Sequence, residues 1–191
     1  MHKQISATCK AAWFYLFQIG KIREYLTEDQ AKTLVHAHVT SRLDTNNSLL
    51  LGTPKKDTRK LQLVQNAAAR MIKGLKKRDH ITPALRSLHW LPVEQRILFK
   101  VLLLTFKALR NQGPDYLKEL LNMYVPARSL RCSTDNIIAV PECHYASTRK
   151  RAFGIRAPNE WNTLPRDIRH KPTVDSFKCA LKTHLFRAAF Y

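Results

Sequence analysis

The chain has 191 residues and is strongly basic, with 33 Lys and Arg residues against 14 Asp and Glu residues and a formal net charge of +19. Hydrophobic residues make up 45% and charged residues 25%, which excludes a disordered tail and predicts one or two folded units. This positive charge favours polyanions as binding partners. We expect nucleic acid before a membrane surface. The other alternative is a basic surface that is only solvated.

The cysteines and the N-terminal segment indicate the compartment. Four cysteines lie far apart and outside any CxxC pattern, which predicts free thiols in a reducing environment. The short apolar run AAWFYLF is not followed by a small-residue cleavage site, and no apolar stretch approaches the roughly 20 residues that span a bilayer. We therefore expect an intracellular protein, nuclear or cytoplasmic, that is neither secreted nor membrane-bound.

Two helices are expected in the N-terminal part. The first covers about residues 5–19, and its helical spacing predicts that its aromatic residues belong to the core. Its apolar residues are Cys9, Ala12, Trp13, Leu16 and Phe17. Thr27 and Gln30 form a capping box, which starts a second helix that runs to about Leu43. The residues that this second helix is expected to bury are Ala31, Leu34, Val35 and Val39.

A longer basic helix is predicted over about residues 55–73, ended by Gly74. Its apolar stripe repeats every three or four residues and consists of Leu61, Val64, Ala68, Met71, Ile72 and Leu75. Polar and basic residues follow the same spacing on another face: Arg59, Gln62, Asn66, Arg70 and Lys73. The triplet Lys76-Lys77-Arg78 then forms a basic loop.

The segment LHWLPVEQRILFK introduces the next helix, over about residues 93–110, with Pro92 at its start. Trp90 stands beside leucine and proline, as Trp161 does later, and for both we favour core packing over stacking on nucleobases. The helix is apolar nearly all round, apart from a narrow stripe of Arg96, Lys100, Lys107 and Arg110.

After this helix the pattern changes. Pro114 begins a short helix, whose expected apolar face is Tyr116, Leu117, Leu120, Leu121 and Tyr124. Prolines recur up to residue 172, and we expect a small hairpin between residues 137–140 and 152–155. A closing helix is predicted over about residues 174–188. The expected fold is mainly α: a helical bundle, a proline-punctuated segment with minor β, and a closing helix. The expected divisions are 1–52, a helical pair; 53–124, a basic bundle; and 125–191.

We find no pattern typical of an active site or a metal centre. His36 and His38 lie about 200° apart on a helix and cannot share one ion. Cys132, Cys143, His144 and the pair Cys179 and His184 have spacings unlike those of zinc sites. No glycine-rich phosphate loop, nucleophile motif or carboxylate cluster for magnesium is present. We therefore expect no enzymatic activity, no cofactor and no bound metal.

Basic side chains remain as the candidates, because Lys and Arg contact nucleic-acid phosphates. For any one of them a solvated surface charge is the simpler interpretation, but as a set they favour backbone binding of RNA or DNA. The candidate residues are Arg59, Arg70, Lys73, Lys76, Lys77, Arg78, Arg96, Lys100, Lys107, Arg110, Arg149, Lys150 and Arg151.

Several blocks, taken in order, resemble one family. They are LVHAHVTSRLDTNNSLLLGTPKK, KLQLVQNAAARMIKG, DHITPALRSLHWLPVEQRILFK, GPDYLKELL, RAFGIRAPNEWNTLPRDIR and SFKCALKTHLF. Together they resemble the region downstream of the polymerase core in reverse transcriptases of non-LTR retrotransposons, of the LINE-type chicken-repeat and jockey-like groups. The resemblance covers almost the whole chain. One departure is the stretch DTNN at residues 44–47, where family members commonly read like DYCNS.

This resemblance implies a thumb-like helical bundle and its downstream part, without the polymerase palm and its metal-binding aspartates, which nothing here matches. The expected function is that of a non-catalytic nucleic-acid-binding remnant, which in the intact family would hold template RNA and target DNA. Three alternatives stay open. They are an enzyme, a helical module that binds a protein partner or itself through exposed apolar helices, and a non-functional fragment of a mobile element.

Overall fold

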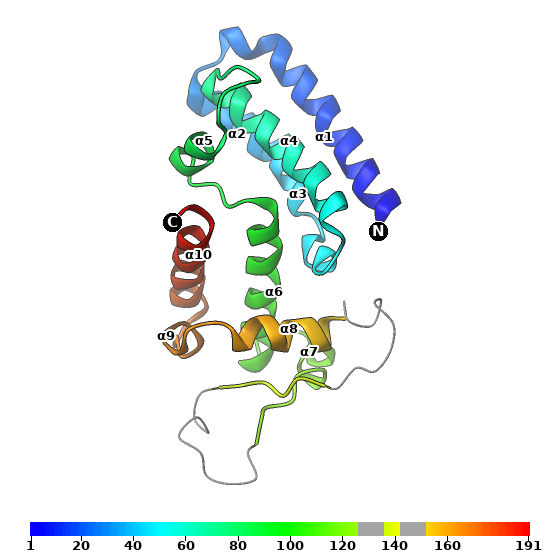
Figure 1. Cartoon of the computed structure of the whole chain (residues 1–191), viewed down its shortest axis with the longest axis vertical. Coiled ribbons are helices and arrows are strands. Elements are labelled where there is room, and N and C mark those ends of the chain that lie inside the picture. Colours follow the sequence, from blue (N-terminus) through cyan, green and yellow to red (C-terminus); the bar gives the residue numbers. More distant parts are fainter. Residues whose placement is uncertain (126–135, 142–151) are drawn as a thin grey trace. The chain divides into compact units, whose positions relative to one another are not determined.

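The computed structural model describes residues 1–125, 136–141 and 152–191. These residues are mainly helical, which confirms the expected fold class (Figure 1). The chain forms two compact units: unit 1 is Met1–Ile97 with Phe186–Tyr191, and unit 2 is Leu98–Leu185. The three-part division expected from the sequence stays a prediction.

Unit 1 is built on two long helices that pack together, α1 and α4. The capping box is confirmed, since the Thr27 hydroxyl accepts from the Gln30 amide and the Gln30 side chain accepts from the Thr27 amide. The helix that it starts continues through one π-helical turn to Asp44. The elements up to α5 are α1 (His2–Ile22), η1 (Arg23–Tyr25), α2 (Glu28–Val35), η2 (His36–Thr40), α3 (Ser41–Asp44), η3 (Asn47–Leu50), α4 (Lys55–Lys73) and α5 (Thr82–Ser87).

The aromatic side chains of α1 do not form the core, so that prediction was wrong. Trp13, Phe14 and Phe17 are 46%, 57% and 65% exposed. The buried row of the helix lies on a neighbouring face and consists of Ile5, Cys9, Ala12, Leu16 and Ile19. Because spacings of three and four residues occur in both rows, periodicity alone could not choose between them.

Helix α4 has the bounds predicted from the sequence, and Gly74 ends it with a φ of 64° in the left-handed region. The buried row includes Leu61, Val64 and Ile72. Arg23 closes the C-terminal end of the helix, because its guanidinium donates to the carbonyls of Met71 (2.9 Å) and Ile72 (2.8 Å). A cation at a helix C-terminus also complements the helix dipole.

Two glutamines of α4 hold the entrance to helix α6 (Val93–Leu109). The Gln65 side chain, which is 1% exposed, donates to the Leu91 carbonyl (2.8 Å), and the Gln62 side chain accepts from the Val93 amide (2.8 Å). Trp90 is 4% exposed, which confirms core packing for it. The polar row of α4 therefore has a structural role at Gln62 that the sequence did not suggest.

The core of unit 2 is a group of three aromatic side chains, one each from α6, α8 (Phe153–Asn162) and α10 (Val174–Phe190). The ring centroids of Phe106 and Phe177 are 4.2 Å apart, and that of Trp161 is 5.9 Å from Phe177. Trp161 is 1% exposed, which confirms the second core tryptophan. Two short helices complete the described part: α7 (Asp115–Glu119) and α9 (Arg166–Arg169).

Of the two strands expected in the hairpin, the one at residues 152–155 is wrong. Ile138 makes an antiparallel bridge with Met123, not with residues 152–155, which begin helix α8. Asn162 then pairs with both backbone groups of Ile138, accepting from its amide (3.0 Å) and donating to its carbonyl (2.8 Å). The Trp161 indole donates to the Asn136 carbonyl (2.7 Å), so the motif APNEWNTLP secures this extended segment.

The helix expected after Pro114 is shorter than predicted. It ends at Glu119, and its supposed apolar face is largely exposed, with Tyr116 at 64% and Leu120 at 48%. Leu121 alone of that set is buried. The following residues, up to Tyr124, adopt the extended conformation that pairs with residues 137–139.

Candidate nucleic-acid interface

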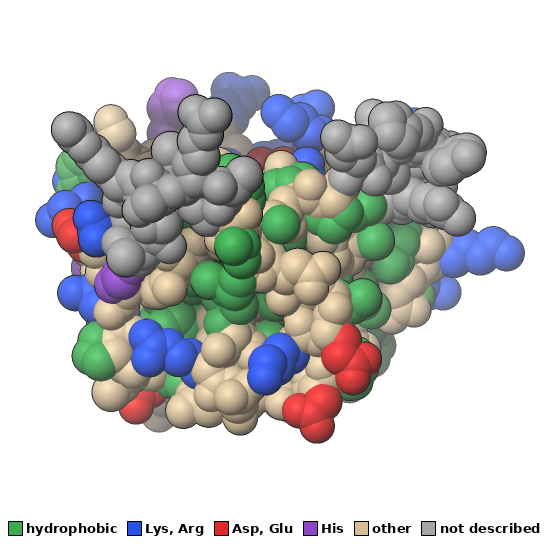
Figure 2. Space-filling view, turned by 90° about the horizontal axis from the view of Figure 1, so that it is seen from below, with side chains coloured by type: hydrophobic (Ala, Val, Ile, Leu, Met, Phe, Trp, Pro, Cys, Tyr) green, Lys and Arg blue, Asp and Glu red, His purple; other side chains and the backbone are tan. Residues whose placement is uncertain are grey.

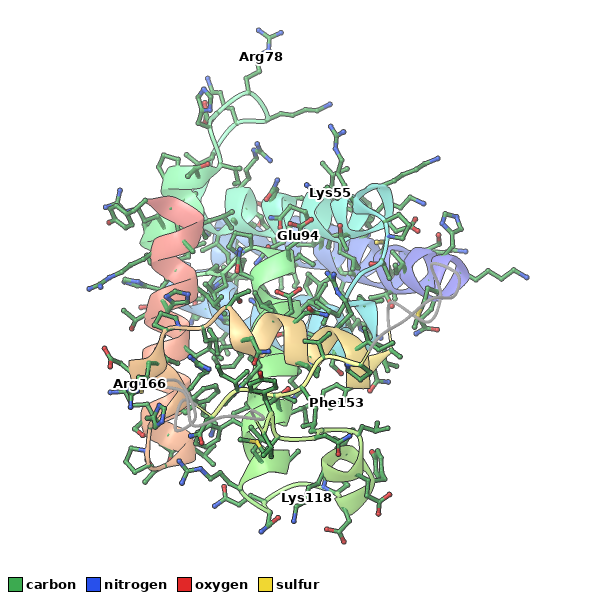
Figure 3. All side chains as sticks on the ribbon, turned by 60° about the horizontal axis from the view of Figure 1, so that its bottom comes forward. Lys55, Arg78, Glu94, Lys118, Phe153 and Arg166 are labelled. Carbon is green, nitrogen blue, oxygen red and sulfur yellow. The ribbon has the colours of Figure 1, made fainter. Side chains whose placement is uncertain are left out.

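The basic loop after α4, Lys76-Lys77-Arg78, has exposed side chains, and hydrogen bonds hold its backbone in place. Lys76, Lys77 and Arg78 are exposed, and their side chains form no hydrogen bond or ion pair with the described residues. The Lys76 amide donates to the Asp79 carboxylate (2.7 Å), and the Arg70 guanidinium donates to the Asp79 carbonyl (3.2 Å). Figure 3 shows Arg78 at the tip of this loop, pointing away from the helices. The loop thus presents three exposed cations and one carboxylate, that of Asp79, which accepts from the Lys76 amide.

A cleft of about 700 Å³ follows the same side of α4 within unit 1. Lys55, Arg59 and Asn66 of α4 line it, and so do Ile81 and Thr82, which come just after the basic loop. The one acidic residue in the lining is Glu94. Because a helix rises 1.5 Å per residue, the stretch from Lys55 to the basic loop extends for about 30 Å, or about nine base steps of duplex.

Four of the candidate cations have partners within the protein. Arg96 makes a two-pronged ion pair with Asp44, its Nε lying 2.8 Å from Oδ1, and Lys73 pairs with Glu28. Arg70 is held by the Asp79 carbonyl as described above. Arg110 donates to the Lys171 carbonyl (2.9 Å), and its guanidinium lies 5.3 Å from the centroid of Phe106. Because these four side chains are engaged within the protein, none of them is counted among the free cations of unit 1.

The Arg96–Asp44 pair gives the first testable prediction. Arg96→Ala lowers the free energy of unfolding by about 1 kcal/mol, because the pair links α6 to α3 but is partly exposed to solvent. A double-mutant cycle with Asp44→Ala, followed by urea unfolding, should give a coupling energy of about 1 kcal/mol. A coupling energy near zero, together with a loss of nucleic-acid affinity in Arg96→Ala, would contradict this assignment and return Arg96 to the interface.

The candidates in unit 2 are fewer. Lys100 is exposed and Lys107 is half-buried on α6, and neither side chain forms a hydrogen bond or ion pair with the described residues. On the face shown in Figure 2, Lys and Arg side chains are scattered among hydrophobic and polar ones and do not form one patch. Arg149, Lys150 and Arg151 lie outside the described residues.

His36 and His38 contact different aromatic residues. The His38 ring stacks on Tyr15 at 5.2 Å between centroids, and the His36 ring meets Trp90 edge-on at 5.3 Å. Partial burial, and then the nearby charge of Arg96, lower the pKa of His36. Across the described ranges, no three His, Cys, Asp or Glu side chains gather as metal ligands would.

The two described cysteines are free thiols, Cys9 being buried and Cys179 exposed. Burial raises the pKa of the Cys9 thiol, with the charge of Lys60 acting in the opposite direction. Cys132, Cys143 and His144 lie outside the described residues.

The chain was compared with known proteins in three ways. No protein-family model matches it, and neither does any curated protein or solved structure. Within the described ranges, every helix is too short or too polar to cross a membrane.

Sequence reasoning missed one surface, the exposed aromatic face of α1. It is formed by Trp13, Phe14 and Phe17, and the Lys21 ammonium lies 4.8 Å from the centroid of Phe17. The signal was present in the sequence, because these three residues and the buried row follow two adjacent faces of one helix. Only the packing against α4 decides which face is covered.

Proposed function

We propose that the chain is a non-catalytic nucleic-acid-binding module that corresponds to the region downstream of the polymerase core in a retrotransposon reverse transcriptase. It binds the phosphate backbone of RNA or DNA through unit 1, largely without regard to sequence. The observation that carries the proposal is the row of free cations beside α4: Lys55, Arg59, Lys76, Lys77 and Arg78.

The charge and the spacing of these cations support the proposal. Lys and Arg that neutralise phosphates release condensed counterions, and this release supplies most of the affinity in sequence-independent binding. The basic loop carries three cations and one acid, Asp79, and Glu94 is the one acid among the described residues that line the cleft. A backbone lying along α4 would meet Lys55 and Arg59 in the cleft and then the three cations of the loop that follows α4.

Fluorescence anisotropy with labelled RNA, DNA and RNA–DNA hybrid tests this proposal. At about 50 mM salt we expect binding of all three with little dependence on sequence, in the range typical of non-specific complexes, a Kd of about 10⁻⁶ M or tighter. Absence of binding at low salt would contradict the proposal. Primer extension with magnesium should yield no product, and extension would place the chain among enzymes instead.

A second candidate function is self-association, which the exposed aromatic face of α1 favours. Large exposed apolar patches mark interaction sites, and this face would be covered in a pair of chains packed through α1. Trp13→Ser combined with Phe17→Ser should then convert a dimer into a monomer, as measured by size exclusion with light scattering. The matched control is Leu49→Ser, because Leu49 is also exposed, at 63%, but lies outside α1. A wild-type chain that stays monomeric at high concentration would rule this candidate out.

A further inference from the structure

Unit 2 contains a buried arginine that has no counter-ion among the described residues. Arg169, at the end of α9, is 7% exposed, and it is the one charged side chain among the buried residues of the described part. Its Nε and Nη1 atoms are enclosed and have no hydrogen-bond partner there. Burying an uncompensated guanidinium is strongly unfavourable, so a partner is expected.

A small cavity lies against this side chain. Its volume is about 250 Å³, the room of about eight waters at roughly 30 Å³ each. Arg169 lines it together with two further cations, Arg110 just after α6 and Lys118 of α7, and none of the described residues in the lining is Asp or Glu. Three segments of the chain thus bring three positive charges to one cavity.

The rest of the cavity lining suits a small oxyanion such as phosphate. Phe106 and Trp161 supply apolar walls, which strengthen electrostatic interactions by excluding water. Arg110 is already held in place by the Lys171 carbonyl and the Phe106 ring, so it loses little freedom on binding. The Nε and Nη1 atoms of Arg169 are two free donors on different sides of the guanidinium, and each offers a separate hydrogen bond to an oxyanion.

We propose that this cavity is a binding site for a phosphate-type oxyanion, held chiefly by Arg169 and assisted by Arg110 and Lys118. The anion arrives either as free phosphate or as the terminal phosphate of a nucleic-acid strand. The site is separate from the interface in unit 1 and stands whether or not that interface binds nucleic acid, because its test uses inorganic phosphate.

Thermal unfolding of the full chain tests the proposal, with chloride replaced by inorganic phosphate at constant pH and ionic strength. A ligand that binds only the folded state raises Tm in a saturable way, and this is the expected result for the wild type. Arg169→Met should weaken the apparent phosphate affinity at least ten-fold. Arg187→Met is the matched control, because Arg187 is exposed on α10 and the same charge is removed, and its phosphate response should equal that of the wild type.

The Tm in chloride gives an independent readout. Arg169→Met should unfold at the same temperature as the wild type or higher, because the variant removes a buried charge that has no counter-ion among the described residues. A large loss of Tm in chloride, an unchanged phosphate response in Arg169→Met, or no response in the wild type would overturn the proposal.

Carboxylates outside the described residues supply a further control. Asp135→Asn and Glu142→Gln should leave both the Tm in chloride and the phosphate response unchanged. If either variant lowers the Tm in chloride and phosphate restores it, Arg169 is neutralised by the chain itself and the proposal fails.

Two oligonucleotides distinguish the sources of the anion. A preference of the wild type for a 5′-phosphorylated strand over the same strand with a 5′-hydroxyl, lost in Arg169→Met, identifies a strand end as the ligand. Equal affinity for the two strands, with the phosphate response of Tm intact, identifies free phosphate.

Discussion

Trp161→Ala lowers the free energy of unfolding of unit 2 by about 3–5 kcal/mol, the range for removing a buried large aromatic side chain. The side chain is 1% exposed, packs with Phe106 and Phe177, and donates its indole N–H to the Asn136 carbonyl. The substitution therefore leaves a cavity and also releases the extended segment at residues 136–138.

Two variants separate these contributions. Trp161→Phe keeps most of the aromatic packing and loses the indole hydrogen bond, worth about 1 kcal/mol on its own. Trp13→Ala removes a tryptophan that is 46% exposed and should cost less than about 1 kcal/mol. Urea unfolding, with amide exchange to assign the loss to Leu98–Leu185, provides the measurement. A Trp161→Ala effect no larger than that of Trp13→Ala would show that unit 2 is not organised around this residue.

Neutralising the basic loop should remove most of the nucleic-acid affinity while leaving the fold intact. In the triple variant Lys76→Ala, Lys77→Ala and Arg78→Ala, the affinity at about 100 mM salt should fall at least ten-fold, as expected when three phosphate contacts are lost. The loop backbone is held by Asp79, whose contacts with the Lys76 amide and the Arg70 side chain do not need the three deleted side chains. Helicity and Tm should therefore stay unchanged.

The matched control removes three exposed cations from elsewhere: Lys3→Ala, Lys10→Ala and Lys182→Ala. Both triple variants lose the same net charge, so a general effect of charge would weaken both equally. We expect the control to lose no more than about three-fold in affinity, through the weaker long-range field alone. Equal losses in the two variants would argue for diffuse attraction and against an interface at the loop.

The sequence predicted those elements whose signals are local. The capping box at Thr27, the bounds of α4 and the left-handed glycine at Gly74 each depend on a few neighbouring residues, and the structure confirms them. Both Trp90 and Trp161 are core residues, as expected from their leucine and proline neighbours.

The errors concern partners that are distant in the chain. Ile138 pairs with Met123, which precedes it in the chain, and not with residues 152–155, which follow it. The Asn162 side chain, 24 residues further on, also bonds the Ile138 backbone. In α1 the choice between two adjacent apolar faces depends on where α4 packs. Neither fact is encoded in local spacing.

The candidate site illustrates the same limit for charges. Arg96 and Lys100 are equivalent in the helical pattern, yet Arg96 is paired with Asp44, 52 residues away, while Lys100 has no such partner in the described part. Arg169 is the opposite case, since nothing in its sequence neighbourhood indicates burial, and only the structure places it beside a cavity.

The salt dependence of binding tests the central claim, phosphate neutralisation by the free cations of unit 1, most directly. The logarithm of the affinity for an RNA–DNA hybrid should fall linearly with the logarithm of salt concentration, and the basic-loop triple variant should have a slope shallower by about 2.7, at about 0.9 per phosphate contact. A wild-type affinity that does not change with salt, or a slope that the triple variant leaves unaltered, would contradict it.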